Sequence, residues 1–150
     1  MSRKIAIYLD TSILNAIFKE PEQRKLLTKN FLNKLLPKFE IYISDLVQAE
    51  IEAAPDDKLR EQLVNSIKDF KVLKTSAEAE EMANEYMKFL KIPKGDALHI
   101  GIASIEGMDY LVTWNMNHIA KENTRRIVDN INFLKGIHRI YIVTPRDFMD

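Results

Sequence analysis

The amino-acid sequence predicts an α/β fold, namely a three-layer α/β/α sandwich built on a five-stranded parallel sheet. Short apolar runs typical of strands alternate with segments in which apolar residues recur at helical spacing. This alternation favours parallel strands joined by right-handed helical crossovers. At 150 residues, the chain is expected to form a single domain spanning residues 1–150.

The apolar run of residues 5–9 is the expected central strand, covered on both faces. Asp10 follows it directly and would lie at the carboxyl end of that strand, the edge where open α/β sheets bind ligands. Thr11 or Ser12 is expected to cap a helix that runs to about Lys19.

The remaining elements are expected in alternating order along the chain. Further strands are predicted at residues 40–43, 70–73, 110–113 and 139–143. Helices are predicted at residues 26–36, 45–51, 55–67, 79–90, 96–106 and 127–134. Ser44 is the expected cap of its helix, and Thr75 with Glu78 matches a capping box. The helix from Asp96 is apolar nearly all round and should therefore be buried.

Composition excludes several classes of function. The chain has no cysteine, which rules out disulfides and thiolate metal sites. Lys and Arg number 22, as do Asp and Glu, which argues against a surface coated in basic charge. We see no signal peptide and no apolar stretch near the ~20 residues of a membrane helix. A complete, cytoplasmic protein without a membrane segment is therefore expected.

Glu50 is the most informative single acidic residue. It lies three and four positions after Val47 and Leu46, which predicts a place on the core-facing stripe of its helix. Burying an unpaired carboxylate is costly, so this group should be protonated, paired or bound to a cation. A salt bridge with a basic residue, or a helix end that turns the group toward solvent, would also account for it.

Asp96 and Asn115 are the other positions expected to converge on Asp10. Asp96 opens the predicted buried helix after Gly95, where an aspartate also serves as a simple N-cap. Asn115 follows the fourth predicted strand, where asparagine is frequent for conformational reasons. That strand is the natural neighbour of the first one, so the crevice between their carboxyl ends would hold Asp10 and Asn115 together.

The nature of these side chains indicates which metal would suit them. His99, His118 and His138 lack the spacing of a zinc site, and His99 is expected in the buried helix with a hydrogen-bonded partner. Oxygen ligands without His or Cys favour Mg²⁺ or Mn²⁺. The hydroxyls of Thr11, Ser12 and Thr113 are interpreted as caps or as hydrogen-bond partners of the carboxylates.

Four segments in this order resemble a PIN domain, most of all the VapC-like proteins of the PilT N-terminus group. They are residues 9–12 (LDTS), 44–51 (SDLVQAEI), 95–103 (GDALHIGIA) and 113–119 (TWNMNHI), and residues 143–147 (VTPRD) also suit the family. The resemblance implies a sheet order of 3-2-1-4-5 and a metal-dependent endoribonuclease. Asp10, Glu50 and Asp96 match the family's acidic triad, while its fourth acidic position is Asn115 here, which brings no negative charge.

The resemblance also implies a role for each group. Mg²⁺ or Mn²⁺, held by Asp10 and Asp96 with Glu50 directly or through water, would activate water and neutralise phosphate charge. RNA phosphates would meet a basic rim at Lys94, Lys121, Arg125 and Arg126, with Thr11, Ser12 and Thr113 as further substrate contacts. A homodimer and a cognate antitoxin that silences the toxin are implied as partners.

Two other hypotheses remain beside the ribonuclease. Asn115 and the balanced charge are compatible with a non-catalytic PIN-like module that binds RNA or a protein partner. A phosphatase or phosphoacceptor domain using Asp10 covalently is less favoured. The haloacid-dehalogenase type needs a second Asp two residues on, where this chain has Ser12.

Overall fold

The computed structural model describes residues 4–149 and contains one five-stranded sheet in the order β3-β2-β1-β4-β5. Every neighbouring pair is parallel. The predicted fold class and strand order are therefore confirmed. The strands are β1 (Ala6–Leu9), β2 (Glu40–Ser44), β3 (Lys71–Leu73), β4 (Tyr110–Val112) and β5 (Tyr141–Val143). The predicted domain of residues 1–150 includes residues 1–3 and 150, which lie outside the described residues.

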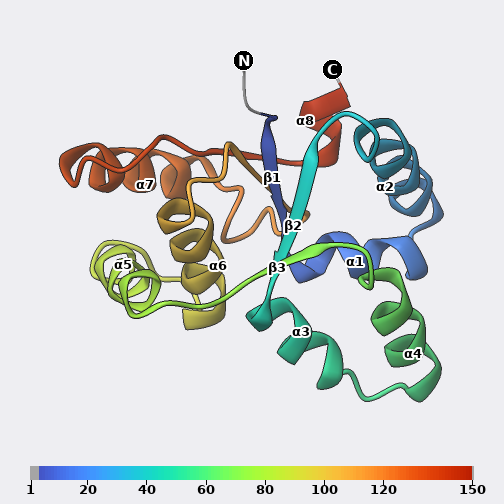
Figure 1. Cartoon of the computed structure of the whole chain (residues 1–150). Helices are drawn as coiled ribbons and strands as arrows, with labels where there is room; N and C mark the ends of the chain where they lie inside the picture. The colour runs from blue at the N-terminus through green and yellow to red at the C-terminus, as the bar shows by residue number, and fades with distance from the viewer. Residues whose placement is uncertain (1–3, 150) are drawn as a thin grey trace.

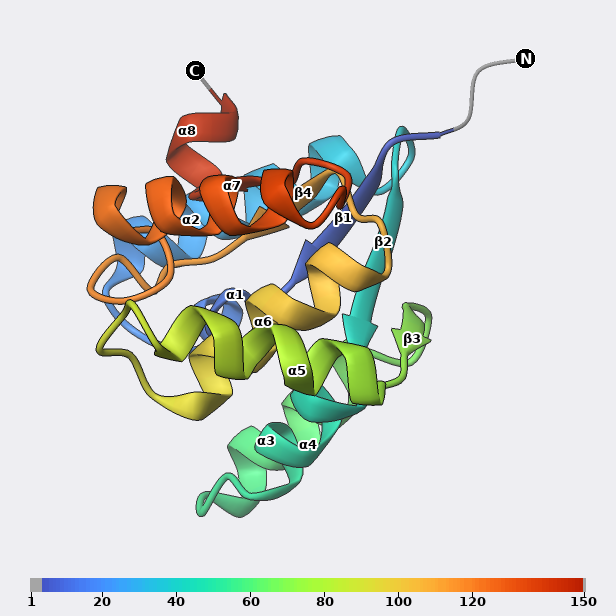
Figure 2. The ribbon, with the colours of Figure 1, turned by 90° about the vertical axis from the view of Figure 1, so that its left-hand side faces the viewer.

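Helices cover both faces of this sheet (Figure 1). On one face lie α5, α6 and α7, and on the other lie α1, α2 and α4; Figure 2 shows α5, α6 and α7 from their own side. The helices are α1 (Thr11–Phe18), α2 (Glu22–Leu35), α3 (Asp45–Glu52), α4 (Asp57–Ser66), α5 (Ala77–Met87), α6 (Lys94–Ile105), α7 (Glu122–Leu134) and α8 (Pro145–Met149). Within the described chain, no helix has the length and apolar character needed to cross a membrane.

The core is centred on β1 and α6. All four residues of β1 are buried, as expected for a strand with neighbours on both edges and helices on both faces. Every α6 residue from Ala97 to Ser104 is buried as well, which confirms the prediction made from its apolar composition. Asp10 directly follows the carboxyl end of β1, and Asp96 lies in the first turn of α6, so the core fixes the position of both residues.

Helix starts were predicted poorly. The helices predicted from residues 26, 55, 79 and 127 begin at Glu22, Asp57, Ala77 and Glu122, and the predicted caps of α1, α5 and α6 are wrong. Asp10, and not Thr11 or Ser12, occupies the N-cap position of α1, and its side chain makes no capping bond. Ser76 caps α5 by accepting a hydrogen bond from the Ala79 N–H. Thr75, predicted as that cap, instead donates to the Asp45 carboxylate at 2.6 Å because a tertiary partner competes with the local one.

The third difference concerns α6. Pro93 occupies the N-cap position and the helix begins at Lys94, so Asp96 lies inside the first turn and does not open the helix. A proline with extended ψ is well suited to precede a helix, and an aspartate is favourable anywhere in the first turn. The shift leaves the Asp96 side chain free of a capping bond and available for a tertiary contact.

Candidate functional site

Asp10 lies at the carboxyl end of β1 and is 3% exposed. Its Oδ1 accepts a hydrogen bond from Ser12 Oγ at 2.6 Å, and its Oδ2 accepts one from Thr113 Oγ1 at 2.5 Å. No Lys or Arg among the described residues forms an ion pair with it. Burial raises the pKa of this carboxyl, although the charge of His99 and the two hydroxyl donors act in the opposite direction.

Glu50 approaches the same edge from the last turns of α3. Its Oε1 accepts hydrogen bonds from Thr11 Oγ1 at 2.5 Å and from His99 Nε2 at 2.8 Å. The side chain is 39% exposed, so the expected core-facing position is wrong. The helix is only eight residues long, and its end directs the side chain across to α6 instead of into the core.

The ionisation of Glu50 is set by competing effects. Partial burial disfavours the carboxylate, but the hydrogen bond and charge of His99, together with the Thr11 hydroxyl, outweigh burial and lower the pKa of Glu50. A site at which one carboxyl has a raised pKa and its neighbour a lowered one contains two chemically distinct acids.

His99 joins this site to the core and was the main residue whose role the sequence did not indicate. Its Nδ1 lies 2.7 Å from Tyr8 Oη, which lies 2.7 Å from Ser44 Oγ, while its Nε2 meets Glu50. The predicted burial of His99 and its hydrogen-bonded partner are confirmed. The spacing from Asp96 to His99 is three residues on one helix, a signal that places both on one face.

Asp96 and Asn115 are both linked to His118. Asp96 Oδ2 lies 2.8 Å from His118 Nδ1, and Asn115 Oδ1 accepts the His118 N–H at 3.0 Å. The Asn115 N–H donates to Thr113 Oγ1 at 2.9 Å. A chain of short contacts therefore leads from Asp10 through Thr113, Asn115 and His118 to Asp96.

A second set of contacts connects Asp10 with Glu50 and with the first turn of α6. Thr11 follows Asp10 in sequence and donates to Glu50. A methyl group added at Gly95 would lie 3.6 Å from Glu50 Oε2, so the first turn of α6 lies against this carboxylate. Asp10, Glu50, Asp96 and Asn115 thus belong to one connected polar region at the carboxyl edge of the sheet.

The donors of this region fit a hard divalent cation in kind. Carboxylate and amide oxygens are preferred by Mg²⁺ and Mn²⁺, and a buried Asp10 without a basic partner is the environment in which a cation would be stabilising. In the described part of the chain, however, no three His, Cys, Asp or Glu side chains converge closely enough to hold an ion together. Glu50 and Asp96 are instead hydrogen-bonded to His99 and His118, which a cation would have to replace.

The predicted basic rim is divided. Lys94 and Arg126 are exposed, and Arg126 donates to Asn123 Oδ1 at 2.8 Å. Lys121 and His118 line a separate pocket. Arg125 instead lines a cavity beside Trp114, the residue that follows Thr113.

The strand order and the polar groups at its carboxyl edge define a PIN-like α/β domain. A family model described as the PIN domain matches residues 7–121 of this chain. The chain therefore belongs to the PIN domain family.

Three solved structures similar to this chain are described as a toxin or as toxin–antitoxin complexes. VapBC2 of Rickettsia felis, bound to a DNA fragment from its promoter, is 23% identical over 93% of this chain and 98% of that chain, with a TM-score of 0.61. VapC20 of Mycobacterium tuberculosis, a Sarcin-Ricin loop cleaving toxin, is 17% identical over 76% of this chain and 93% of that chain, with a TM-score of 0.61. A toxin–antitoxin complex from Klebsiella pneumoniae is 19% identical over 79% and 93%, with a TM-score of 0.62. A comparison with curated protein sequences found no match.

Proposed function

We propose that this PIN domain is a metal-dependent endoribonuclease that hydrolyses RNA phosphodiester bonds. The observation that carries the proposal is Asp10: a buried carboxylate with a raised pKa, without a basic partner, connected by short contacts to Asp96 and next to Glu50. Membership of the PIN family and the likeness in fold to VapC20, a Sarcin-Ricin loop cleaving toxin, support it.

Asp10, Glu50 and Asp96 would hold Mg²⁺ or Mn²⁺, with Asn115 adjoining them. The ion, when bound, supplies activation of water and neutralisation of charge on the attacked phosphate. Neighbouring side chains orient the carboxylates that would bind the ion. Ser12 and Thr113 fix both oxygens of Asp10, and His99 holds Glu50 ionised.

His118 and Asn115 have positioning roles in this proposal. Asn115 Oδ1 accepts the His118 N–H and so fixes the backbone of His118, whose ring contacts the Asp96 carboxylate. The amide therefore substitutes for a fourth carboxylate without adding charge. Fewer negative charges weaken the binding of a second cation, so one tightly bound ion is expected without RNA.

We further propose that the protein is the toxin of a toxin–antitoxin pair, acts in the cytoplasm as a homodimer, and is silenced by an antitoxin. The support is that several solved structures similar in fold are complexes of toxins with antitoxins. Co-expression tests this arrangement. The chain alone should arrest growth, and an adjacent small gene should relieve the arrest.

The decisive test of the activity is RNA cleavage with a titration of Mn²⁺ and Mg²⁺. Structured and single-stranded RNAs should be cut by the wild type and left intact by Asp10→Asn and Asp96→Asn. Arg139→Gln, far from the site, is the matched control and should cut normally. Intact RNA with every substrate and metal would overturn the proposal.

A second function, a non-catalytic module that binds RNA or a protein, is favoured by one observation. Glu50 and Asp96 are each engaged by a histidine of the same chain. Under this alternative the histidines substitute permanently for a cation. RNA binding that is unaffected by EDTA and never followed by cleavage would favour it.

A further inference from the structure

A cavity of about 480 Å³ lies beside the candidate site, beyond the carboxyl ends of β4 and β5. Its walls come from the start of α2, the segment after β4, the start of α7 and the corner between β5 and α8. The residues that matter here are Arg24, Trp114, Arg125, Arg146 and Asp147. Four segments far apart in the sequence thus meet around one hollow.

The cavity is joined directly to Asp10. The Trp114 N–H donates to Ser12 Oγ at 2.8 Å, and Ser12 Oγ donates in turn to Asp10 Oδ1 at 2.6 Å. Because Trp114 lines the cavity, two hydrogen bonds separate its wall from the buried carboxylate. The cavity is therefore a close neighbour of the candidate site.

The floor of the cavity is held in place by specific contacts. Trp114 Nε1 donates to Thr28 Oγ1 at 2.8 Å, and Thr28 Oγ1 donates to the Arg24 carbonyl at 2.7 Å. The Arg24 guanidinium lies over the Trp114 ring, 4.9 Å from its centroid. Arg24 is therefore oriented by its neighbours and not left to sample solvent.

The charges around the cavity are unbalanced toward positive. Three guanidinium groups face one carboxylate, Asp147, which accepts from the Thr144 N–H at 3.1 Å and from Arg125 Nη2 at 3.4 Å. Since Asp147 is already engaged in capping α8, it offsets the positive charge only in part.

Arg125 and Arg146 retain unused donors. Arg125 Nε is buried and has no hydrogen-bond partner among the described residues. Arg146 is exposed and forms no ion pair with any residue in the described range. A buried N–H without an acceptor is uncommon, so Arg125 keeps a donor that no described side chain satisfies.

We propose that this cavity binds a backbone phosphate of the RNA next to the phosphate that is cleaved. Guanidinium groups match phosphate oxygens with paired N–H donors, and the position beside Asp10 suits a neighbouring nucleotide. This inference rests on the proposed ribonuclease function, and it assigns the substrate contact to Arg24, Arg125 and Arg146 instead of to Arg126 or Lys94.

The test measures binding of a labelled single-stranded RNA by fluorescence anisotropy, in EDTA so that no cleavage occurs, across a series of salt concentrations. Arg125→Gln and Arg146→Gln should each weaken binding about tenfold, the loss expected for one charge-assisted contact. Each should also reduce the slope of log affinity against log salt by about 0.7. Unchanged melting temperatures establish that both variants are folded.

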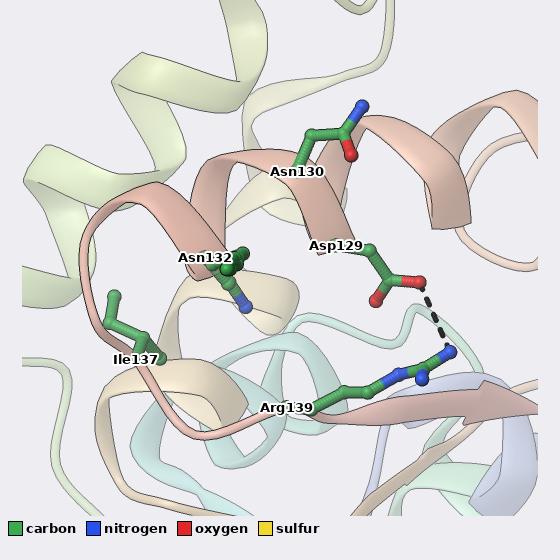
Figure 3. Close-up of a pocket in the computed structure, with 6 residues that line it drawn as sticks. Asp129, Asn130, Asn132, Ile137 and Arg139 are labelled. Atoms are coloured by element: carbon green, nitrogen blue, oxygen red, sulfur yellow. Dashed lines mark hydrogen bonds and ion pairs between the residues drawn. The ribbon is translucent and has the colours of Figure 1, made fainter.

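Arg139→Gln is the matched control. Arg139 lines a second cavity of about 540 Å³ before the start of β5, at the opposite edge of the sheet (Figure 3). It lies 3.5 Å from Asp129 Oδ2. The variant loses the same charge as the two test variants. Because Arg139 is remote from the proposed phosphate site, the variant should keep the wild-type RNA affinity and salt slope.

Each remaining outcome overturns the assignment in a distinguishable way. A wild type that cuts RNA while Arg125→Gln and Arg146→Gln bind RNA normally excludes the phosphate site and leaves the nuclease proposal intact. Equal weakening by Arg139→Gln shows a general effect of charge. Inorganic phosphate that binds the wild type and not the two arginine variants, while all three bind RNA equally, shows a site for the free ion only. A wild type that neither binds nor cuts RNA removes both proposals.

Discussion

At the scale of single residues, the site depends on how each carboxylate is paired. Asp10 is buried against two hydroxyls, Glu50 is half exposed beside His99, and Asp96 contacts His118. Both oxygens of Asp10 accept hydrogen bonds from neutral hydroxyls, whereas Glu50 and Asp96 each contact a histidine ring directly. Because of this difference, we expect a bound cation to stabilise the ionised form of Asp10 more than that of Glu50 or Asp96.

Asp10→Asn should abolish RNA cleavage, by at least about a hundredfold, yet stabilise the fold. Because burial raises the pKa of Asp10, the native state takes up its proton more readily than the unfolded state. The free energy of unfolding therefore falls as pH rises through that pKa, and the neutral amide removes this penalty. Thermal melts at pH 7 should show an increase of a few degrees. A clear decrease would contradict this account of Asp10.

Glu50→Gln should have the opposite dependence on pH. The pKa of Glu50 is lowered from 4.5, so its charge stabilises the native state above that range and loses this effect as pH falls through the native pKa. Melting of the variant should lie below that of the wild type at pH 7 by no more than a few degrees, since solvent screens the group. The two curves should meet in acid. A difference that persists in acid strong enough to protonate Glu50 in both states would rule out this origin.

Residue roles were predictable from the sequence only in part. Asp10, Glu50 and Asp96 stand out because acidic groups follow or interrupt apolar patterns. The pairing of Glu50 with His99 depends on how α3 is oriented against α6, which no local pattern encodes. Asn115 shows the same limit, because its turn with His118 is local while the contact from His118 to Asp96 is tertiary.

At the scale of elements, α6 is the helix that positions the site. It lies between α5 and the sheet, and its first turn carries Asp96 and places Gly95 against Glu50. The close approach of α5 is made at Gly101, where an added Cβ would lie 2.5 Å from the Ala79 carbonyl oxygen. Because the contact at Gly101 is with the backbone of α5, no flexible side chain could move aside to admit a methyl group.

Gly101→Ala should therefore destabilise the protein by about 1–3 kcal/mol through forced separation of α5 and α6. Gly95→Ala is the matched control in the same helix, because its Cβ would make only an ordinary contact of 3.6 Å with Glu50 Oε2. Chemical denaturation of both variants measures the difference. Equal stability of the two would show that α5 and α6 are free to move apart.

Element positions were predicted well where periodicity is strong and poorly at helix starts. The buried α6 follows from its continuous apolar composition. The starts of α1 and α5 differ because Asp10 and Thr75 bind tertiary partners, Thr113 and Asp45, that are remote in sequence. Capping propensity describes only the hydrogen bond that a side chain can make to its own helix, and not the tertiary partners that compete with it.

At the scale of the whole molecule, strand order brings the site together. Placing β1 between β2 and β4 aligns the carboxyl ends that lead to Asp10, Ser44 and Thr113. The sheet order came from the resemblance to the PIN family, whereas alternation of strands and helices indicates only that the sheet is parallel. The cavity lined by Arg24 and Arg125 could not be predicted, because it forms from four separate segments.

Divalent metal should stabilise the whole domain, because a ligand that binds only the native state raises the melting temperature. Mn²⁺ at about 100 times its dissociation constant is worth about 2.7 kcal/mol. The effect should grow with pH, as binding displaces the proton favoured by the raised pKa of Asp10. Asp96→Asn should lose most of the shift. An equal shift in that variant would place the ion elsewhere.

The central claim is that Asp10, Glu50 and Asp96 serve one divalent ion. Anomalous diffraction from a crystal soaked in Mn²⁺ tests it most directly. We expect one strong peak bonded to the Asp10 and Asp96 carboxylates, with the Asp96 contact to His118 broken. A peak remote from Asp10, or none at saturating Mn²⁺, would contradict the claim.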